Sequence, residues 1–85
     1  MAYILYGVIR SRTMRELTEF YIKSRGGKIL FYVDDQKPRF SVNYPVRQTA
    51  EIAQYPHAVI VLMNQGAVQL AAKLRRQGIK NVLAV

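Results

Sequence analysis

The stretch Tyr3-Ile4-Leu5-Tyr6-Gly7-Val8-Ile9-Arg10-Ser11-Arg12-Thr13 decides how this chain folds. An apolar run ends at Gly7, and Thr13-Met14-Arg15-Glu16 has the pattern of a capping box that opens a helix. A strand, a glycine turn and a helix N-terminus in this order are typical of α/β proteins that hold a phosphate. Backbone N–H groups and the positive end of the helix dipole then face the same point.

Three arginines crowd the start of the expected helix: Arg10, Arg12 and Arg15. The helix dipole disfavours a cation at this end by about 0.3–1 kcal/mol. Their placement therefore favours an anionic ligand nearby. A second interpretation is that these arginines only keep a small domain soluble.

Apolar runs alternate with amphipathic segments along the rest of the chain. We expect strands at residues 3–6, 29–33, 58–63 and 82–85, and helices at about 14–25 and 65–77. Residues 37–46 predict an edge strand or an extended loop, and residues 49–55 predict a turn or two of helix. Asn64 is expected to cap the second long helix.

Each long helix is expected to bury one apolar face. In the first helix this face comprises Met14, Leu17, Phe20 and Tyr21, and in the second it comprises Ala67, Leu70, Ala71 and Leu74. The basic residues of the first helix, among them Arg15, Lys23 and Arg25, are expected to form its solvated face.

Strands that alternate with helices predict βαβ units with right-handed crossovers. We therefore expect one α/β domain over residues 1–85, with a small open parallel sheet of about four strands in the order 2-1-3-4, flanked by helices. Ligands of such sheets bind at the carboxyl ends of the strands, at the point where the strand order reverses. The segments Gly7–Thr13 and Asn64–Gly66 are accordingly expected to face each other across one crevice.

The composition indicates the kind of partner. The 85 residues include 13 Lys and Arg against 5 Asp and Glu, which gives a formal charge of +8 and a pI of about 10.2. This balance favours phosphates, nucleic acid or an acidic protein surface. The absence of cysteine excludes a disulfide framework and a thiol nucleophile and favours a reducing cytoplasm. No apolar run approaches the ~20 residues of a membrane span.

Few residues suggest chemistry. Asp34 and Asp35 end the second strand, where an acid could accept hydrogen bonds from a ribose; the alternative is that they only start a turn. The single histidine, His57, has no cysteine or clustered acids with which to hold a metal, and we expect a structural or surface role for it. The sequence contains no catalytic constellation.

Several short motifs together resemble a known family. They are Tyr6-Gly7 closing the first strand, Val33-Asp34-Asp35 closing the second, Tyr44-Pro45-Val46 after the irregular stretch, and an apolar strand followed by a helix. This order is similar to the small Rossmann-like domain at the front of bacterial sugar acyltransferases, which bind nucleotide-linked amino sugars. Related domains accompany nucleotide-sugar epimerase/dehydratases and some methyltransferases.

The resemblance implies a nucleotide-sugar site, and it implies that the chain is the front of a larger protein. The family usually has Gly-x-Gly-Gly after the first strand, whereas here Val8-Ile9-Arg10-Ser11-Arg12 follows Gly7. Either arginine side chains take the place of closely approaching backbone here, or the phosphate site is lost. Acetyl transfer belongs to a β-helix that follows this domain in the family, so acetyltransferase activity is not implied here.

The sequence thus predicts a Rossmann-like binding module for a phosphate-bearing ligand, a nucleotide-sugar or a dinucleotide, without chemistry of its own. Its expected ligand-binding residues are Gly7, Arg10, Ser11 and Arg12 for the phosphates, Asp34 or Asp35 for the ribose, and Asn64 to Gly66 to close the crevice. The alternative is a basic scaffold or regulator that binds nucleic acid or an acidic protein. The apolar strand Val82–Val85 at an uncovered sheet edge also favours self-association or a downstream domain.

Overall fold

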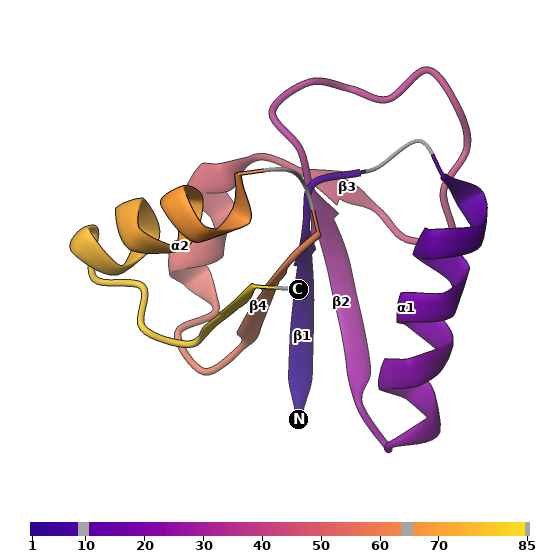
Figure 1. Cartoon of the computed structure of the whole chain (residues 1–85), viewed down its shortest axis with the longest axis horizontal. Helices are drawn as coiled ribbons and strands as arrows, with labels where there is room; N and C mark the ends of the chain where they lie inside the picture. The colour runs from indigo at the N-terminus through magenta and orange to yellow at the C-terminus, as the bar shows by residue number, and fades with distance from the viewer. Residues whose placement is uncertain (9–10, 64–65, 85) are drawn as a thin grey trace.

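The computed structural model describes residues 1–8, 11–63 and 66–84. Its elements (Figure 1) are β1 (Ala2–Tyr6), α1 (Arg12–Ser24), β2 (Lys28–Val33), β3 (Val46–Arg47), the 3-10 helix η1 (Thr49–Gln54), β4 (Val59–Leu62), α2 (Ala67–Arg76) and β5 (Val82–Ala84). None of the helices in these ranges is both long and apolar enough to cross a membrane.

The five strands form one open parallel sheet in the order β3-β2-β1-β4-β5. The predicted α/β class is confirmed, and the four predicted strands are neighbours in the predicted order. The structure adds β3, a two-residue edge strand beside β2, within the segment expected to be an edge strand or a loop. The backbone N–H of Tyr32 donates to the carbonyl of Pro45, 2.9 Å away. Because proline has no N–H of its own, the pairing at this edge stays short.

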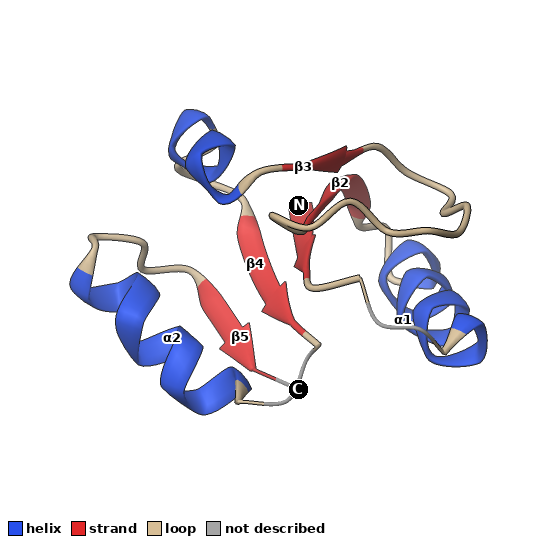
Figure 2. Ribbon diagram, turned by 90° about the horizontal axis from the view of Figure 1, so that it is seen from above, coloured by secondary structure: helices blue, strands red, loops and turns tan. Residues whose placement is uncertain are grey.

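The helices cover both faces of the sheet, α1 on one side and α2 with η1 on the other (Figure 2). Alternate strand residues point to opposite faces, so the sheet supports two apolar cores. The core under α2 and η1 contains Ile4, Phe31, Val33, Ile52, Ala58, Ile60, Leu62, Ala71 and Leu74. The core on the α1 side contains Leu5, Ile22, Ile29, Tyr32 and Val61. The larger core is the one that α2 covers.

The two long helices begin differently from the prediction. Ser11, and not Thr13, is the N-cap of α1: its Oγ accepts a hydrogen bond from the N–H of Met14 at 3.3 Å. Glu16 therefore lies beyond the capping position and pairs instead with Arg12 at 2.7 Å. At α2 the N-cap position is Gly66, with a φ of 76° and no side-chain cap; the predicted cap Asn64 lies outside the described residues.

The orientation of α1 is the main departure from the sequence prediction. The side chains expected in its buried face are exposed: Met14 by 53%, Leu17 by 57%, Phe20 by 71% and Tyr21 by 58%. The buried residues of α1 are instead Arg15, Glu19 and Ile22. The prediction that Arg15 belongs to the solvated face is therefore wrong as well. In α2 the expected residues Ala71 and Leu74 are buried.

Candidate functional site

The segment that joins β2 to β3 shapes the carboxyl edge of the sheet. After β2 it rises above the strand ends and then descends beside α1 before it reaches β3 (Figure 1). It was expected to be irregular, and the structure gives it no regular element between Asp34 and Pro45. Clefts lie under and beside this arch, at the end of the sheet where α/β proteins bind their ligands.

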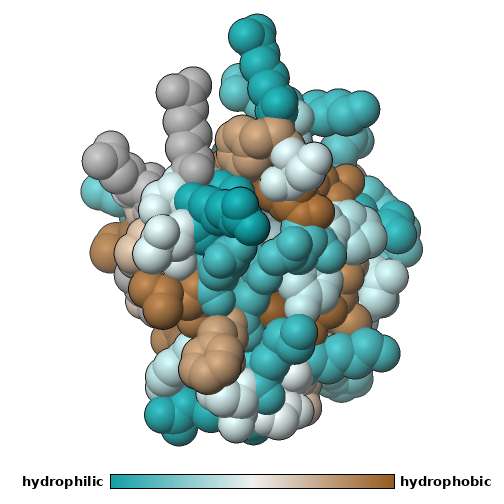
Figure 3. Space-filling view, turned by 90° about the vertical axis from the view of Figure 1, so that its right-hand side faces the viewer, coloured by the Kyte–Doolittle hydropathy of each residue, from teal (hydrophilic) through white to brown (hydrophobic). Residues whose placement is uncertain are grey.

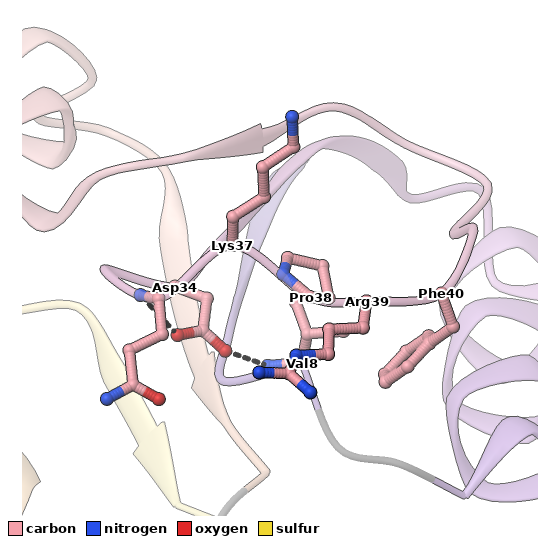
Figure 4. Close-up of a pocket in the computed structure, with 7 residues that line it drawn as sticks. Val8, Asp34, Lys37, Pro38, Arg39 and Phe40 are labelled. Atoms are coloured by element: carbon pink, nitrogen blue, oxygen red, sulfur yellow. Dashed lines mark hydrogen bonds between the residues drawn. The ribbon is translucent and has the colours of Figure 1, made fainter.

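The first cleft has a volume of about 540 Å³ and lies over the ends of β1 and β2. It is lined by Val8, Asp34, Gln36, Lys37, Pro38, Arg39 and Phe40. In Figure 4, Arg39 extends toward Val8, whereas Lys37 extends away from the strand ends. Both cations are exposed, and the only carboxylate among the lining residues belongs to Asp34. An anion entering this cleft would therefore meet a net positive charge.

Asp34 holds the floor of this cleft together. Its Oδ2 accepts a hydrogen bond from the backbone N–H of Val8 at 3.3 Å, drawn in Figure 4, and its Oδ1 accepts one from the N–H of Gln36 at 3.0 Å. The carboxylate thus ties the end of β1 to the turn after β2, which is the turn-forming role foreseen as an alternative. Each oxygen retains a second lone pair that a ligand hydroxyl could use.

Asp35 points toward η1. One of its oxygens accepts from the backbone N–H of Thr49 at 2.9 Å and the other from the hydroxyl of Thr49 at 2.8 Å. The same hydroxyl oxygen lies 2.9 Å from the phenolic oxygen of Tyr6. The backbone hydrogen bond, followed by the side-chain one, lowers the pKa of Asp35, and the charge of Lys73 acts in the same direction. Asp35 therefore anchors the start of η1 as an ionised acceptor.

A second cleft, of about 520 Å³, lies between the first turns of α1 and the descending part of the arch. Its lining residues are Arg12, Arg15, Glu16, Phe40, Ser41, Val42 and Asn43. Phe40 lines both clefts, and the guanidinium carbon of Arg15 lies 4.6 Å from the centre of its ring. A cation stacked on the ring in this way fixes one side of the aromatic group that separates the two clefts.

Hydrogen bonds to the buried side chain of Glu19 fix the arch to α1. The hydroxyl of Tyr32 donates to one oxygen of Glu19 at 2.5 Å, and the amide of Asn43 donates to the other at 2.9 Å. Burial, followed by the hydrogen bond to Glu19, raises the pKa of Tyr32. On the side of α1 that faces the sheet, Glu19 lies beside the apolar Ile22 and supplies the acceptor that the Tyr32 hydroxyl and the Asn43 amide require.

The residues predicted to bind phosphate are used in several ways. The N–H of Gly7, whose φ is 90°, donates to the carbonyl of Val33 at 2.8 Å and so continues the sheet. Ser11 caps α1, and Arg12 lies in the second cleft. Gly7, Asp34 and Asp35 together line a smaller hollow of about 240 Å³.

The other side of the predicted crevice is only partly described. Gly66 lies after β4 at the start of α2. The predicted residues Arg10 and Asn64 lie outside the described residues.

Sequence reasoning did not assign Lys37, Arg39 and Phe40 to the site. The available signal was their position: two cations and an aromatic residue surround Pro38 immediately after Asp34-Asp35, at the end of a predicted strand. The alternation of Phe40, Val42 and Tyr44 with polar residues indicates only an edge strand or a loop and does not point to a binding site. The irregular backbone of this segment is what allows it to arch over the strand ends.

Comparison of the sequence with models of protein families gives no match, and no curated protein matches it either. The resemblance to the sugar acyltransferase domain therefore remains a hypothesis. Among the described residues no group of three or more histidine, cysteine, aspartate or glutamate side chains is placed to hold a metal ion.

Proposed function

We propose that this chain is a binding module for a phosphate-bearing small molecule, a nucleotide-sugar or a dinucleotide, without chemistry of its own. The observation that carries the proposal is the pair of clefts at the carboxyl edge of the sheet, which share Phe40 and have arginines or lysines in each wall. Parallel α/β sheets bind nucleotides at this edge.

In this proposal guanidinium groups replace the glycine-rich loop. The N–H of Gly7 is bonded to Val33, so it does not serve a phosphate. Arg39 and Arg12 supply donors instead; Arg12 uses its Nε on Glu16 and retains its other N–H groups. Guanidinium groups bind phosphate oxygens in bidentate fashion. Arginine side chains can therefore form a phosphate site in which the backbone does not come close to the phosphate.

The other predicted residues take supporting roles. Ser11 accepts a hydrogen bond from Met14 and can donate its own hydroxyl hydrogen to a phosphate. Phe40, with Arg15 on its ring, offers a surface on which a base can stack. Asp34 can accept from a ribose hydroxyl with its second lone pairs, and so can Asp35, whose two oxygens each accept one hydrogen bond from Thr49.

Ligand-dependent stability tests this proposal. A panel of inorganic pyrophosphate, nucleoside diphosphates, dinucleotides and nucleotide-sugars is added at millimolar concentration, and the thermal midpoint is measured. A ligand at 100 times its Kd stabilises the native state by about 2.7 kcal/mol. Arg39→Ala and Arg12→Ala should reduce the shift, whereas Arg76→Ala, at the far end of α2, should not. No shift with any ligand, or an equal shift in all three variants, would contradict the proposal.

The alternative, a basic scaffold or regulator that binds nucleic acid or an acidic protein, has one structural observation in its favour. All five side-chain carboxylates lie in the described ranges, and each has a partner within the chain: Glu16, Glu19, Asp34, Asp35 and Glu51. The cationic surplus is therefore available to an external anion. Binding to duplex DNA would show a slope of log K against log[salt] near −0.9 per phosphate neutralised. A weak salt dependence would favour the small-molecule site.

A further inference from the structure

The side of α1 that points away from the sheet exposes four apolar side chains. We call Met14, Leu17, Phe20 and Tyr21 the outer face of α1. This side of the molecule is toward the viewer in Figure 3, where hydrophobic side chains reach the surface between hydrophilic ones. All four are more than half exposed. Grouped apolar exposure of this kind marks an interaction surface, since isolated apolar residues alone need no explanation.

The spacing of the outer face suits a second helix. Met14, Leu17 and Tyr21 recur at i, i+3 and i+7, the a, d and a positions of a heptad, and Phe20 lies beside them at a g position. The 13 residues of α1 make a helix about 20 Å long, and the seam from Met14 to Tyr21 takes up about 10 Å of it. Side chains spaced in this way interlock with those of a facing helix and remove apolar surface from water.

The charges around the outer face select the partner. Lys23, Arg25 and Lys28 are exposed near the C-terminal end of α1, and the guanidinium carbon of Arg25 lies 4.3 Å from the ring centre of Tyr21. A second copy would bring the same cations and the same net charge of +8 to the interface. The occupant must therefore supply negative charge of its own.

We propose that the outer face of α1 binds an acidic amphipathic α-helix of another protein. Its apolar seam covers Met14, Leu17, Phe20 and Tyr21, and its flanking carboxylates meet Lys23, Arg25 and Lys28. This surface is separate from the clefts, because the residues that α1 contributes to the second cleft are Arg12, Arg15 and Glu16. The proposal therefore does not rest on the phosphate-binding function.

The test uses a synthetic helical peptide with leucine at the a and d positions and glutamate at e and g. Fluorescence anisotropy of the labelled peptide is measured with the full chain. Leu17→Glu and Phe20→Glu should each weaken binding more than about tenfold, as expected for a residue at the centre of an interface. Val68→Glu is the matched control, because Val68 is an exposed apolar residue on α2, where it is 74% accessible; it should bind as the original chain does. Circular dichroism checks that each variant folds.

Three results would overturn the proposal. The first is no binding of the acidic peptide, or equal binding by Leu17→Glu and the original chain. The second is tighter association with vesicles of anionic phospholipid than with the peptide, lost in Leu17→Glu, which would assign the face to a membrane surface. The third is a dimer in sedimentation that Leu17→Glu abolishes, which would assign it to a second copy. Arg39→Ala should bind the peptide normally, so failure here is distinguishable from failure of the phosphate site.

Discussion

The two long helices, α1 and α2, are both amphipathic, yet they present opposite faces to the sheet. α2 buries Ala71 and Leu74, as its apolar stripe predicts. α1 buries Arg15 and Glu19 together with Ile22 and exposes its apolar stripe. The comparison teaches that a helical period identifies which residues share a face, while the groups available on the neighbouring elements decide which face is buried.

The largest effect should come from truncating the same residue type in each helix. Leu74→Ala removes a side chain that is 1% exposed from the core under α2 and should reduce the free energy of unfolding by about 2–5 kcal/mol. Leu17→Ala changes an exposed position and should stay within about 0.5 kcal/mol of the original chain. Urea denaturation measures both. Comparable losses would show that α1 buries its apolar stripe after all.

A second variant breaks the polar contact that orients α1. Glu19→Ala leaves the buried Tyr32 hydroxyl without its acceptor, and a loss of this kind costs about 1–3 kcal/mol. The Asn43 amide loses the same acceptor, but Asn43 is exposed and its amide can bond to water instead. Glu16→Ala is the control on the same helix. It removes an exposed i,i+4 pair with Arg12, which is worth about 0.3–0.5 kcal/mol. If the two variants unfold at the same urea concentration, the buried network does not hold α1 in place.

The smallest effect is a dependence of stability on alkaline pH. The pKa of Tyr32 is raised from its ordinary value of 10.0, chiefly by burial and then by Glu19. Its contribution to stability should be complete below about pH 10 and should decline as the pH rises further, because the unfolded chain then ionises first. Titration of phenolate absorbance should reveal one tyrosine that ionises at a higher pH than the others. This last step of the titration should be absent in Tyr32→Phe. The same late step in Tyr32→Phe would mean that a different tyrosine is responsible.

Four of the five strands could be predicted because each is a short apolar run, and a run such as Ala58 to Met63 has few other structures open to it. The buried face of α1 could not be predicted from the sequence, because it depends on the contact of Glu19 with Tyr32 and Asn43, which lie 13 and 24 residues away. No local pattern encodes such a meeting.

The candidate site, too, could be predicted only in part. The position of Asp34 and Asp35 at the end of a strand followed from the sequence, and the structure places both there. Their hydrogen bonds to Val8 and Thr49 did not, since those partners lie on other elements. Arg39 and Phe40 belong to a segment that predicts only an edge strand or a loop, and the arch above the sheet is what brings them to the clefts.

One helix forms the boundary between two surfaces of this protein. Arg15 and Phe40 meet on the inner side of α1, and Leu17 and Phe20 project from its outer side. A tilt of α1 would move the guanidinium group of Arg15 and, with it, the ring of Phe40 that lies between the clefts. If a ligand at one surface tilts α1, the affinity of the other surface changes, and by linkage the influence is equal in both directions.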